Sequence, residues 1–176
     1  MRIIAGRFKK ANLYSISGTR IRPTTDYTKE VIFNILHELE DKKVLDLYSG
    51  CGSLGLEALS RGAAHVTFID FSEHAIGAMI KNFKKLNCSS ECRIYRKRVS
   101  SFLKKTTKTF DIIFADPPYN KNLVNQTIDK ILKNTILNPG GKIIVEHSPN
   151  ELIQNLWDAN ISTRQLSRNT SLSFIS

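Results

Sequence analysis

The sequence lacks any apolar run that approaches the ~20 residues needed to span a bilayer. Its first ten residues, MRIIAGRFKK, contain too short an apolar stretch for a signal peptide. We therefore expect a cytoplasmic protein that has no membrane partner.

Cysteine is scarce as well, because the chain holds only Cys51, Cys88 and Cys92 and has no CxxC pair. An odd number of cysteines at these spacings disfavours both a disulfide framework and a structural zinc site. We expect free, mostly buried thiols and no bound metal.

Acidic residues are absent from the first 25 positions, which hold six Lys or Arg residues. Over the whole chain, 26 basic residues against 16 acidic ones give a formal net charge of +10. A second excess lies at 81–110, where ten basic residues accompany the single acid Glu91. Such clusters favour a polyanionic partner, and the solvated face of a basic protein is the alternative interpretation.

Two patterns alternate over the 176 residues, a length that suits one compact domain. Short apolar, partly β-branched segments predict strands, and the segments between them, with apolar residues every three or four positions, predict helices. The strands are expected at 42–48, 65–70, 92–98, 109–116 and 140–148, and the helices at 53–61, 72–86 and 123–136, the last ended by Pro139-Gly140-Gly141. This order predicts right-handed βαβ units and a mostly parallel α/β sheet.

The two ends of the chain depart from this alternation. The run RIIAGRF is β-like and a helix is expected at 25–39, so residues 1–40 are interpreted as a small basic extension. Residues 162–176 alternate around Asn169-Thr170, which predicts an antiparallel hairpin that closes the sheet. We assign 41–176 to the main domain, within one globule overall.

The stretch DLYSGCGSLG (46–55) follows the first main-domain strand and opens a helix. Gly50, Gly52 and Gly55 form the GxGxxG fingerprint of nucleotide-binding α/β folds. Asp70 lies twenty residues beyond Gly50, where a ribose-binding acid belongs. Because strand, turn, helix and acid occur in the required order, the loop predicts a nucleotide-type cofactor and not merely a tight turn.

Asp46 discriminates between cofactors, because it lies four residues before Gly50 and is expected to face the crevice beyond the strand ends. Beside a dinucleotide pyrophosphate, two like charges ~4 Å apart at an effective dielectric near 20 cost on the order of 4 kcal/mol. S-adenosylmethionine (SAM) carries an ammonium and a sulfonium instead, so Asp46 favours SAM over NAD. An NAD-linked oxidoreductase is further disfavoured because no hydride-transfer constellation is recognisable.

A third acid, Asp116, ends the strand predicted at 109–116 and begins the stretch DPPY. Asp116 and the carbonyl of Pro117 can accept both hydrogens of an exocyclic amine, which frees the nitrogen lone pair to attack a methyl group. Pro117 and Pro118 donate no backbone hydrogen bonds and fix the turn. Tyr119 offers a ring face on which a target base can stack. Alone, DPPY is typical of a strand-terminating turn; beside the cofactor loop it predicts methylation of a base amine.

Four stretches carry a resemblance to a known family: RIIAGRF at the start, RPTTDYTKEVIFNIL at 22–36, DLYSGCGSLGLEALSRGA at 46–63 and FADPPYNK at 114–121. In this order they resemble the bacterial small-subunit rRNA guanine-N2 methyltransferases, the RsmD-like family, through about residue 148. DPPY alone is shared with many amino-methylating enzymes, so the N-terminal pair and the helix GLEALSRGA narrow the resemblance.

The resemblance implies a class I SAM-dependent methyltransferase fold, in which one methyl group is transferred to N2 of a guanine in 16S rRNA within the small ribosomal subunit. We expect a monomer whose extension, 1–40, faces the RNA. The cofactor candidates are Asp46, Tyr48, Ser49, Gly50, Gly52, Asp70, Phe71 and Val99. The catalytic candidates are Asp116, Pro117, Pro118 and Tyr119. The RNA-contacting candidates are Arg2, Arg7, Lys9, Arg22, Thr24 and Thr25.

Two positions depart from the family pattern. Arg98-Val99 follows the third main-domain strand, where the family usually has a small polar or acidic residue beside the cofactor's adenine. A backbone group is therefore expected to make that contact. Asn169 stands in the closing hairpin where the family generally has glycine, and Asn tolerates a left-handed turn.

Two other functions stay open at this point. An N6-adenine DNA methyltransferase can share DPPY and the cofactor loop, but such enzymes usually add a module that reads DNA sequence, for which 176 residues leave no room. A non-catalytic basic RNA-binding module with a vestigial fold is the other, and the presence of Asp46, Asp70 and Asp116 argues against it.

Overall fold

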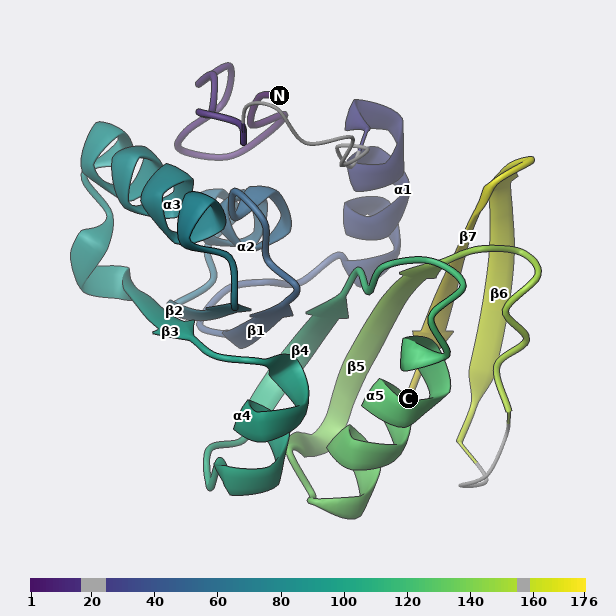
Figure 1. The fold of residues 1–176 in the computed structure, drawn as a ribbon. Coiled ribbons are helices and arrows are strands. Elements are labelled where there is room, and N and C mark those ends of the chain that lie inside the picture. Colours follow the sequence, from purple (N-terminus) through teal and green to yellow (C-terminus); the bar gives the residue numbers. More distant parts are fainter. Residues whose placement is uncertain (17–24, 155–158) are drawn as a thin grey trace.

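The computed structural model describes residues 1–16, 25–154 and 159–176, in which seven strands form one mixed sheet with helices on both faces (Figure 1). The helices are α1 (Asp26–Leu36), α2 (Ser53–Ser60), α3 (Glu73–Leu86), α4 (Val99–Lys105) and α5 (Leu123–Lys133), with a short 3-10 turn η1 (Ser89–Glu91). The strands are β1 (Lys43–Leu47), β2 (His65–Asp70), β3 (Cys92–Arg96), β4 (Phe110–Ala115), β5 (Leu137–His147), β6 (Ile161–Ser167) and β7 (Thr170–Ile175). None of the helices in these ranges is long and apolar enough to cross a membrane.

The strand order β3-β2-β1-β4-β5-β7-β6 confirms the predicted α/β fold. The strands β1 to β5 pair in parallel, whereas β7 pairs antiparallel with both β5 and β6. The chain crosses from one side of β1 to the other between β3 and β4, so the order reverses between β1 and β4. Ligands of open α/β sheets bind beyond the carboxyl ends of the strands at such a reversal.

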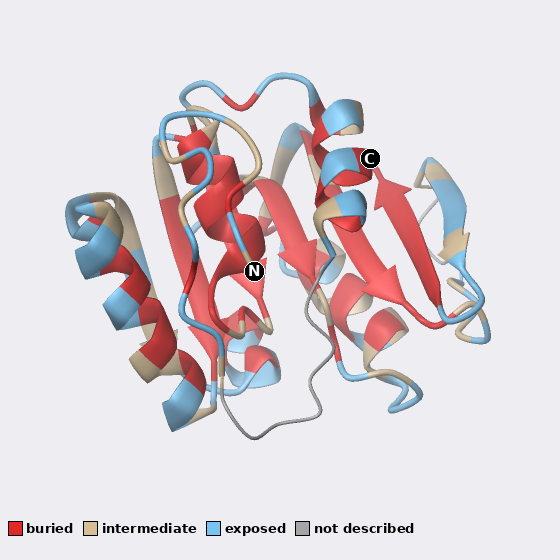
Figure 2. Ribbon diagram, turned by 90° about the horizontal axis from the view of Figure 1, so that it is seen from above, coloured by how far each residue is buried: buried red, intermediate tan, exposed pale blue. Residues whose placement is uncertain are grey.

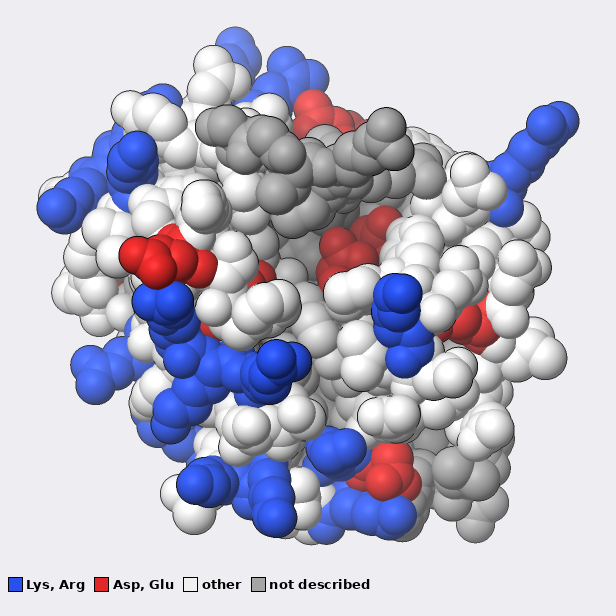
Figure 3. All heavy atoms as spheres, viewed as in Figure 1, with Lys and Arg blue, Asp and Glu red and all other residues white. Residues whose placement is uncertain are grey.

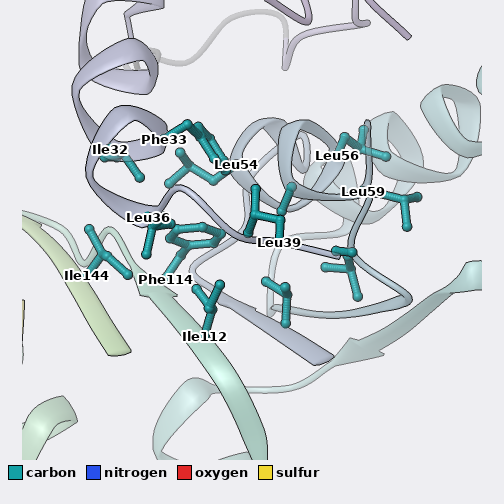
Figure 4. Packing of buried hydrophobic residues seen from close by; sticks show 14 of the residues in the cluster. Ile32, Phe33, Leu36, Leu39, Leu54, Leu56, Leu59, Ile112, Phe114 and Ile144 are labelled. Carbon is teal, nitrogen blue, oxygen red and sulfur yellow. The ribbon is translucent and has the colours of Figure 1, made fainter. Parts of the chain in front are cut away.

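Each face of the sheet is covered by its own apolar layer, as Figure 2 shows by the buried strands between two sets of helices. Helices α1, α2 and α3 pack on one face, and α4 and α5 on the other. Phe33 of α1 meets Phe114 of β4 edge-on with ring centroids 5.7 Å apart, and Leu36 and Leu54 lie beside this pair (Figure 4). Burial of each such side chain contributes about 1.5–3 kcal/mol. The layer thereby fixes β4, the strand that leads into Asp116.

The predicted entry to the fifth strand is wrong. Helix α5 ends at Lys133 and β5 begins at Leu137, so Pro139-Gly140-Gly141 lies inside β5 instead of ending a helix. The pairing register with β4 shifts between Phe110 and Ile112, which accommodates the extra residues of β5. Gly140, at a φ of 72°, supplies the left-handed backbone of this detour.

Helix α4 is not predicted by the sequence pattern. Its apolar residues, Val99, Phe102 and Leu103, span too short a window for helical periodicity to register. The run RIIAGRF is not a strand either, because it forms turns with one isolated bridge between Arg2 and Asn12. The helix predicted at 25–39 is shorter and is α1.

The closing hairpin is present, but its turn lies one residue earlier than predicted. Arg168 and Asn169 form the connection between Ser167, which ends β6, and Thr170, which begins β7. Asn169 does not have a positive φ, so the turn does not use the left-handed conformation that asparagine tolerates. The pairing register instead shifts between Gln165 and Ser167.

The N-terminal segment is clamped onto α2 by one buried carboxylate. Glu57, which is fully buried, accepts the backbone N–H of Ile4 at 2.8 Å and that of Ala5 at 3.0 Å. Its Oε1 also accepts the Nε–H of Arg61 at 2.8 Å. Gly6 follows at a φ of 77°, where a Cβ would lie 1.8 Å from the Ser60 carbonyl oxygen. The stretches RIIAGRF and GLEALSRGA, which carry much of the family resemblance, therefore pack against each other. The assignment of residues 1–40 as a separate extension stays a prediction.

Replacing the clamp residue should destabilise the fold. Glu57→Ala is expected to lower the free energy of unfolding by about 2–4 kcal/mol, because two buried N–H groups lose their acceptor. Urea denaturation measures this change, with Glu38→Ala, an exposed acid, as the control. A loss for Glu57→Ala no larger than that of the control would contradict the clamp.

Candidate active site

Three acids end up at the same edge of the sheet because their strands run parallel. Asp46 lies in β1 and pairs with Phe68, Asp70 ends β2, and Asp116 follows the last residue of β4. Figure 3 shows acidic side chains in a hollow of this face. The structure thus places the three predicted acids at one edge.

The glycine loop folds as its sequence requires. Gly50 and Gly52 adopt left-handed φ values of 55° and 84°, and Gly52 caps the start of α2. A Cβ on Gly55 would lie 2.3 Å from the ring of Phe68, so only glycine allows α2 to pack this closely on β2. A Cβ on Gly50 would meet no atom within 4 Å, so the loop is open at that position.

Two of the acids also shape this loop. Asp46 accepts the N–H of Gly55 at 3.0 Å, and Asp70 accepts the N–H of Gly50 at 2.9 Å through its second oxygen. The other oxygen of Asp70 accepts the N–H of Ser72 at 2.8 Å, at the start of α3. Each carboxylate therefore ties a strand end to the helix or loop that follows and retains further lone pairs for a ligand.

The side chains of Ser49 and Tyr48 are engaged within the protein. The Ser49 hydroxyl donates to the Asp46 carbonyl at 2.6 Å and accepts the N–H of Ile69 at 2.9 Å, which joins β1 to β2. The Tyr48 hydroxyl lies 2.9 Å from the hydroxyl of Thr127 on α5. These two cofactor candidates can contribute backbone groups, while their side chains hold the loop in place.

Phe71 and Val99 stand in contrasting positions. The Phe71 ring is 61% exposed, with the Arg98 guanidinium carbon 5.7 Å from its centroid. The Val99 side chain is buried in the core layer under α4, so it cannot meet a ligand. A flat ligand ring can therefore meet the face of Phe71, and the departure at Arg98 places a cation over that same ring.

The DPPY turn brings in a residue that the sequence interpretation missed. Asp116 is partly exposed, and the Tyr119 hydroxyl donates to Oε1 of Glu146 at 2.8 Å. Glu146 is buried and directly follows Val145, the partner of Ala115, so it lies in β5 level with Asp116. The sequence could have indicated Glu146 in the same way as the other three acids, because it lies near the end of the predicted strand GGKIIVEHS.

Burial and neighbouring charges raise the pKa values of Asp46 and Asp116. Burial raises the pKa of Asp46 to about 8; the Gly55 N–H lowers it and the charge of Asp70 raises it. Burial also raises the pKa of Asp116 well above its usual range, and the charges of Glu146 and Asp46 raise it further. A crevice of this kind favours a cationic ligand and disfavours a pyrophosphate.

The RNA-contacting candidates are placed less uniformly. Arg2 pairs with Asp26 at 2.9 Å and Arg7 with Glu91 at 2.5 Å, whereas Lys9 is exposed. The sixth candidate, Thr25, caps α1 by accepting the N–H of Thr28 at 3.0 Å. Arg22 and Thr24 lie outside the described residues.

Comparison with known proteins places this geometry in a family. The family model described as conserved hypothetical protein 95 matches residues 1–175. The chain belongs to this family. The "Ribosomal RNA small subunit methyltransferase D" of Buchnera aphidicola subsp. Baizongia pistaciae is 37% identical over 163 residues, which are 89% of this chain and 83% of that protein. The protein of the same name from Haemophilus influenzae is 37% identical over 150 residues, covering 83% of this chain and 78% of its own length.

Solved structures agree with the sequence relatives. The Escherichia coli protein yhhF superposes with a TM-score of 0.90 at 31% identity, covering 99% of this chain and 96% of its own. Methyltransferase structures at 17% and 20% identity have TM-scores of 0.68 and 0.70, a likeness that shows the fold alone. The resemblance to the RsmD-like family and the SAM-dependent methyltransferase fold are confirmed.

The acid cluster predicts a pH-dependent stability. The pKa of Asp46 rises from about 3.9 in the unfolded chain to about 8 in the folded one. Ionised Asp46 therefore destabilises the folded state relative to the unfolded chain, whereas protonated Asp46 does not. Its destabilising effect is therefore absent below about pH 4 and grows as the pH rises to 8.

Asp46→Asn should consequently be more stable than the parent chain at pH 8, by roughly 2–5 kcal/mol, and the gap should narrow towards pH 4. Urea denaturation at both pH values measures it, with Asp41→Asn, an exposed acid, as the matched control. A pH profile for Asp46→Asn that parallels the parent chain would contradict the raised pKa.

Proposed function

We propose that this chain transfers a methyl group from SAM to the exocyclic N2 amine of a guanine in 16S rRNA, within the small ribosomal subunit. The proposal rests on the convergence of Asp46, Asp70 and Asp116 at one sheet edge beside a glycine loop. The names of the relatives, which specify methyl transfer and small-subunit rRNA, support the substrate class.

The donor set of the crevice fits SAM. Asp46 can meet the ammonium group, because burial and the charge of Asp70 leave it in need of a positive charge. Asp70 can accept the ribose hydroxyls with its remaining lone pairs, and the exposed ring of Phe71 can stack on the adenine. When bound, SAM supplies a methyl group that its sulfonium makes electrophilic.

The DPPY turn would prepare the target amine. Asp116 and the Pro117 carbonyl accept the two N–H groups, which draws the nitrogen out of conjugation with the base ring and frees its lone pair. The raised pKa of Asp116 suits it to take up the proton that the nitrogen then loses. Tyr119, held by Glu146 through its hydroxyl, keeps its ring in place for stacking.

The pair of acids beside the turn favours guanine. Guanine presents N1–H next to its N2 amine, so two adjacent donors can face Asp116 and Glu146. Adenine presents an acceptor at the corresponding ring position, so it offers only its amine as a donor to this pair of acids. The N6-adenine DNA methyltransferase therefore fits this site less well.

Removing the proposed catalytic acid should separate chemistry from cofactor binding. Asp116→Ala is expected to lower turnover by roughly 10²–10³-fold while SAM still binds, because Asp116 acts on the amine. Tritiated-methyl transfer to small subunits from a strain that lacks its own enzyme measures turnover, and Asp129→Ala on α5 is the control.

Mapping the modified base in the same assay tests the substrate. Label on a DNA duplex but not on small subunits would overturn the RNA proposal. Near-normal turnover by Asp116→Ala would overturn the assignment of the DPPY acid, and absence of SAM binding to the parent chain would favour a non-catalytic module.

Cofactor binding should also release a proton. At pH 7 the Asp46 carboxyl, with a pKa of about 8, is mostly protonated in the free chain and must ionise opposite an ammonium. Calorimetry in two buffers with different ionisation enthalpies is expected to show close to one proton released. Asp46→Asn should bind SAM more weakly and release fewer protons; an undiminished release would place the titrating group elsewhere.

A further inference from the structure

The edge strand β3 carries an aromatic ring surrounded by cations. The Tyr95 ring centroid lies 6.0 Å from the Arg93 guanidinium carbon, 5.8 Å from Lys97 Nζ and 5.9 Å from Lys108 Nζ. Its other neighbour is the ring of Phe102 at 5.4 Å, which supports it from the core. We call Arg93, Tyr95, Lys97 and Lys108 the Tyr95 patch.

The charge of this patch is not compensated within the described part of the chain. Arg93, Lys97 and Lys108 are exposed, and none of them has a carboxylate oxygen of a described residue within 4.0 Å. Glu91, the only acid at 81–110, is already paired with Arg7. Burial tends to raise the pKa of Tyr95, but hydrogen bonding and charge from Arg93 and Lys108 lower it overall. Three cations are thus held together without a counter-charge.

The strand geometry arranges the patch as a track. Arg93 and Tyr95 lie on one side of β3, about 6.6 Å apart along the strand. Lys97 follows Arg96, the last residue of β3. Lys and Arg side chains gather on the part of the surface over β3 and α4 in Figure 3, and Lys104 and Lys105 of α4 add to them. Cations around a partly exposed ring match the requirements of a single-stranded nucleic acid: phosphates on the cations and a base on the ring.

The track begins at the cofactor edge. Arg96 pairs in register with Asp70, and the backbone N–H of Lys97 donates to the Asp70 carbonyl at 3.0 Å. Three strand spacings of about 4.8 Å separate β3 from β4, so the patch lies roughly 14 Å across the sheet from the strand that ends at Asp116. An RNA strand that places one nucleotide at Asp116 can reach it.

We propose that the Tyr95 patch is a second RNA-contact surface, which binds a single-stranded segment flanking the methylated nucleotide. The inference rests on the proposed function and adds a location to it. It also assigns part of the RNA contact to β3 at the edge of the sheet and less of it to the N-terminal extension, where Arg2 and Arg7 are paired with acids.

The test compares two charge-matched variants. Lys97→Ala/Lys108→Ala removes two cations of the patch, and Lys81→Ala/Lys84→Ala removes two exposed cations of α3, on the opposite face of the sheet. Binding to small subunits and to a single-stranded oligoribonucleotide is measured as a function of salt. The patch variant should flatten the log–log salt dependence by about 1.4–1.8, because each phosphate contact contributes about 0.7–0.9. The control should keep the slope of the parent chain.

The ring is tested separately. Tyr95→Ala should weaken RNA binding by roughly 5- to 150-fold, the effect of losing one base stack, whereas Tyr95→Phe should retain it. Lys97→Ala/Lys108→Ala should raise KM for small subunits, while kcat at saturation, SAM affinity and Tm stay unchanged. Tyr95→Ala should also raise KM at an unchanged kcat, but its Tm should fall because the ring packs against Phe102, whereas Tyr95→Phe keeps that packing.

The outcomes separate the two proposals. If the parent chain fails to methylate small subunits, the proposed function is wrong. If it methylates them and the patch variants match either the parent chain or the α3 control in salt slope and KM, the function stands and the cations form only a solvated face. Equal losses for Tyr95→Ala and Tyr95→Phe would remove the stacking role.

Discussion

Mutual repulsion among buried acids is the constraint on which the rest of this structure depends. Asp46 feels the charge of Asp70, and Asp116 feels those of Glu146 and Asp46, in a crevice where all but the partly exposed Asp116 are buried. Such an arrangement is unfavourable in the free protein unless protons or a cation neutralise it. It persists because the acids lie at strand ends whose positions are set by the sheet and not by the acids themselves.

Packing on both faces of the sheet fixes the positions of the strand ends that form the site. Phe33 and Phe114 lock α1 onto β4 on one side, and the layer under α4 and α5 closes the other. The glycine loop is also held in place, because Ser49 joins β1 to β2 and Gly55 allows α2 to pack closely on Phe68. A rigid scaffold can hold groups in an electrostatically strained arrangement that a cationic ligand relieves, which is how binding sites commonly trade stability for function.

Much of the fold and of the candidate site could be predicted because the features that form them depend on local sequence patterns. The alternation of strands and helices, the glycine fingerprint and the strand-end acids each have a short signature, and parallel pairing brings their ends together. What could not be predicted depends on contacts distant in sequence. In the sequence, Pro139-Gly140-Gly141 is typical of a helix end, and only the pairing of β5 with β4 shows that this stretch lies within a strand. Glu57 reads as an ordinary helical acid until Ile4 and Ala5 approach it.

Charge was the signal most easily misjudged from sequence, because a count of cations says nothing about their partners. The N-terminal segment has no acid of its own, yet Arg2 and Arg7 find Asp26 and Glu91 in the fold. Pairing reduces the field that a polyanion would feel from them, while it leaves the stems of both side chains on the surface. The cations around Tyr95 lie in a chain segment with a larger excess, ten cations against one acid at 81–110, and their charges are not paired with described carboxylates.

Two opposite fields therefore share one edge of the sheet. The acidic crevice suits a cationic cofactor and an uncharged base, and it would repel a phosphate backbone. The basic track suits that backbone and would gain nothing from the cofactor. The track lies roughly 14 Å from the strand that leads into Asp116, more than the Debye length of about 8 Å at physiological salt, so on the solvent side its cations and Asp116 interact only weakly. A polynucleotide can then be held by its phosphates at β3 while only a base, turned out of its strand, enters the acids at β4.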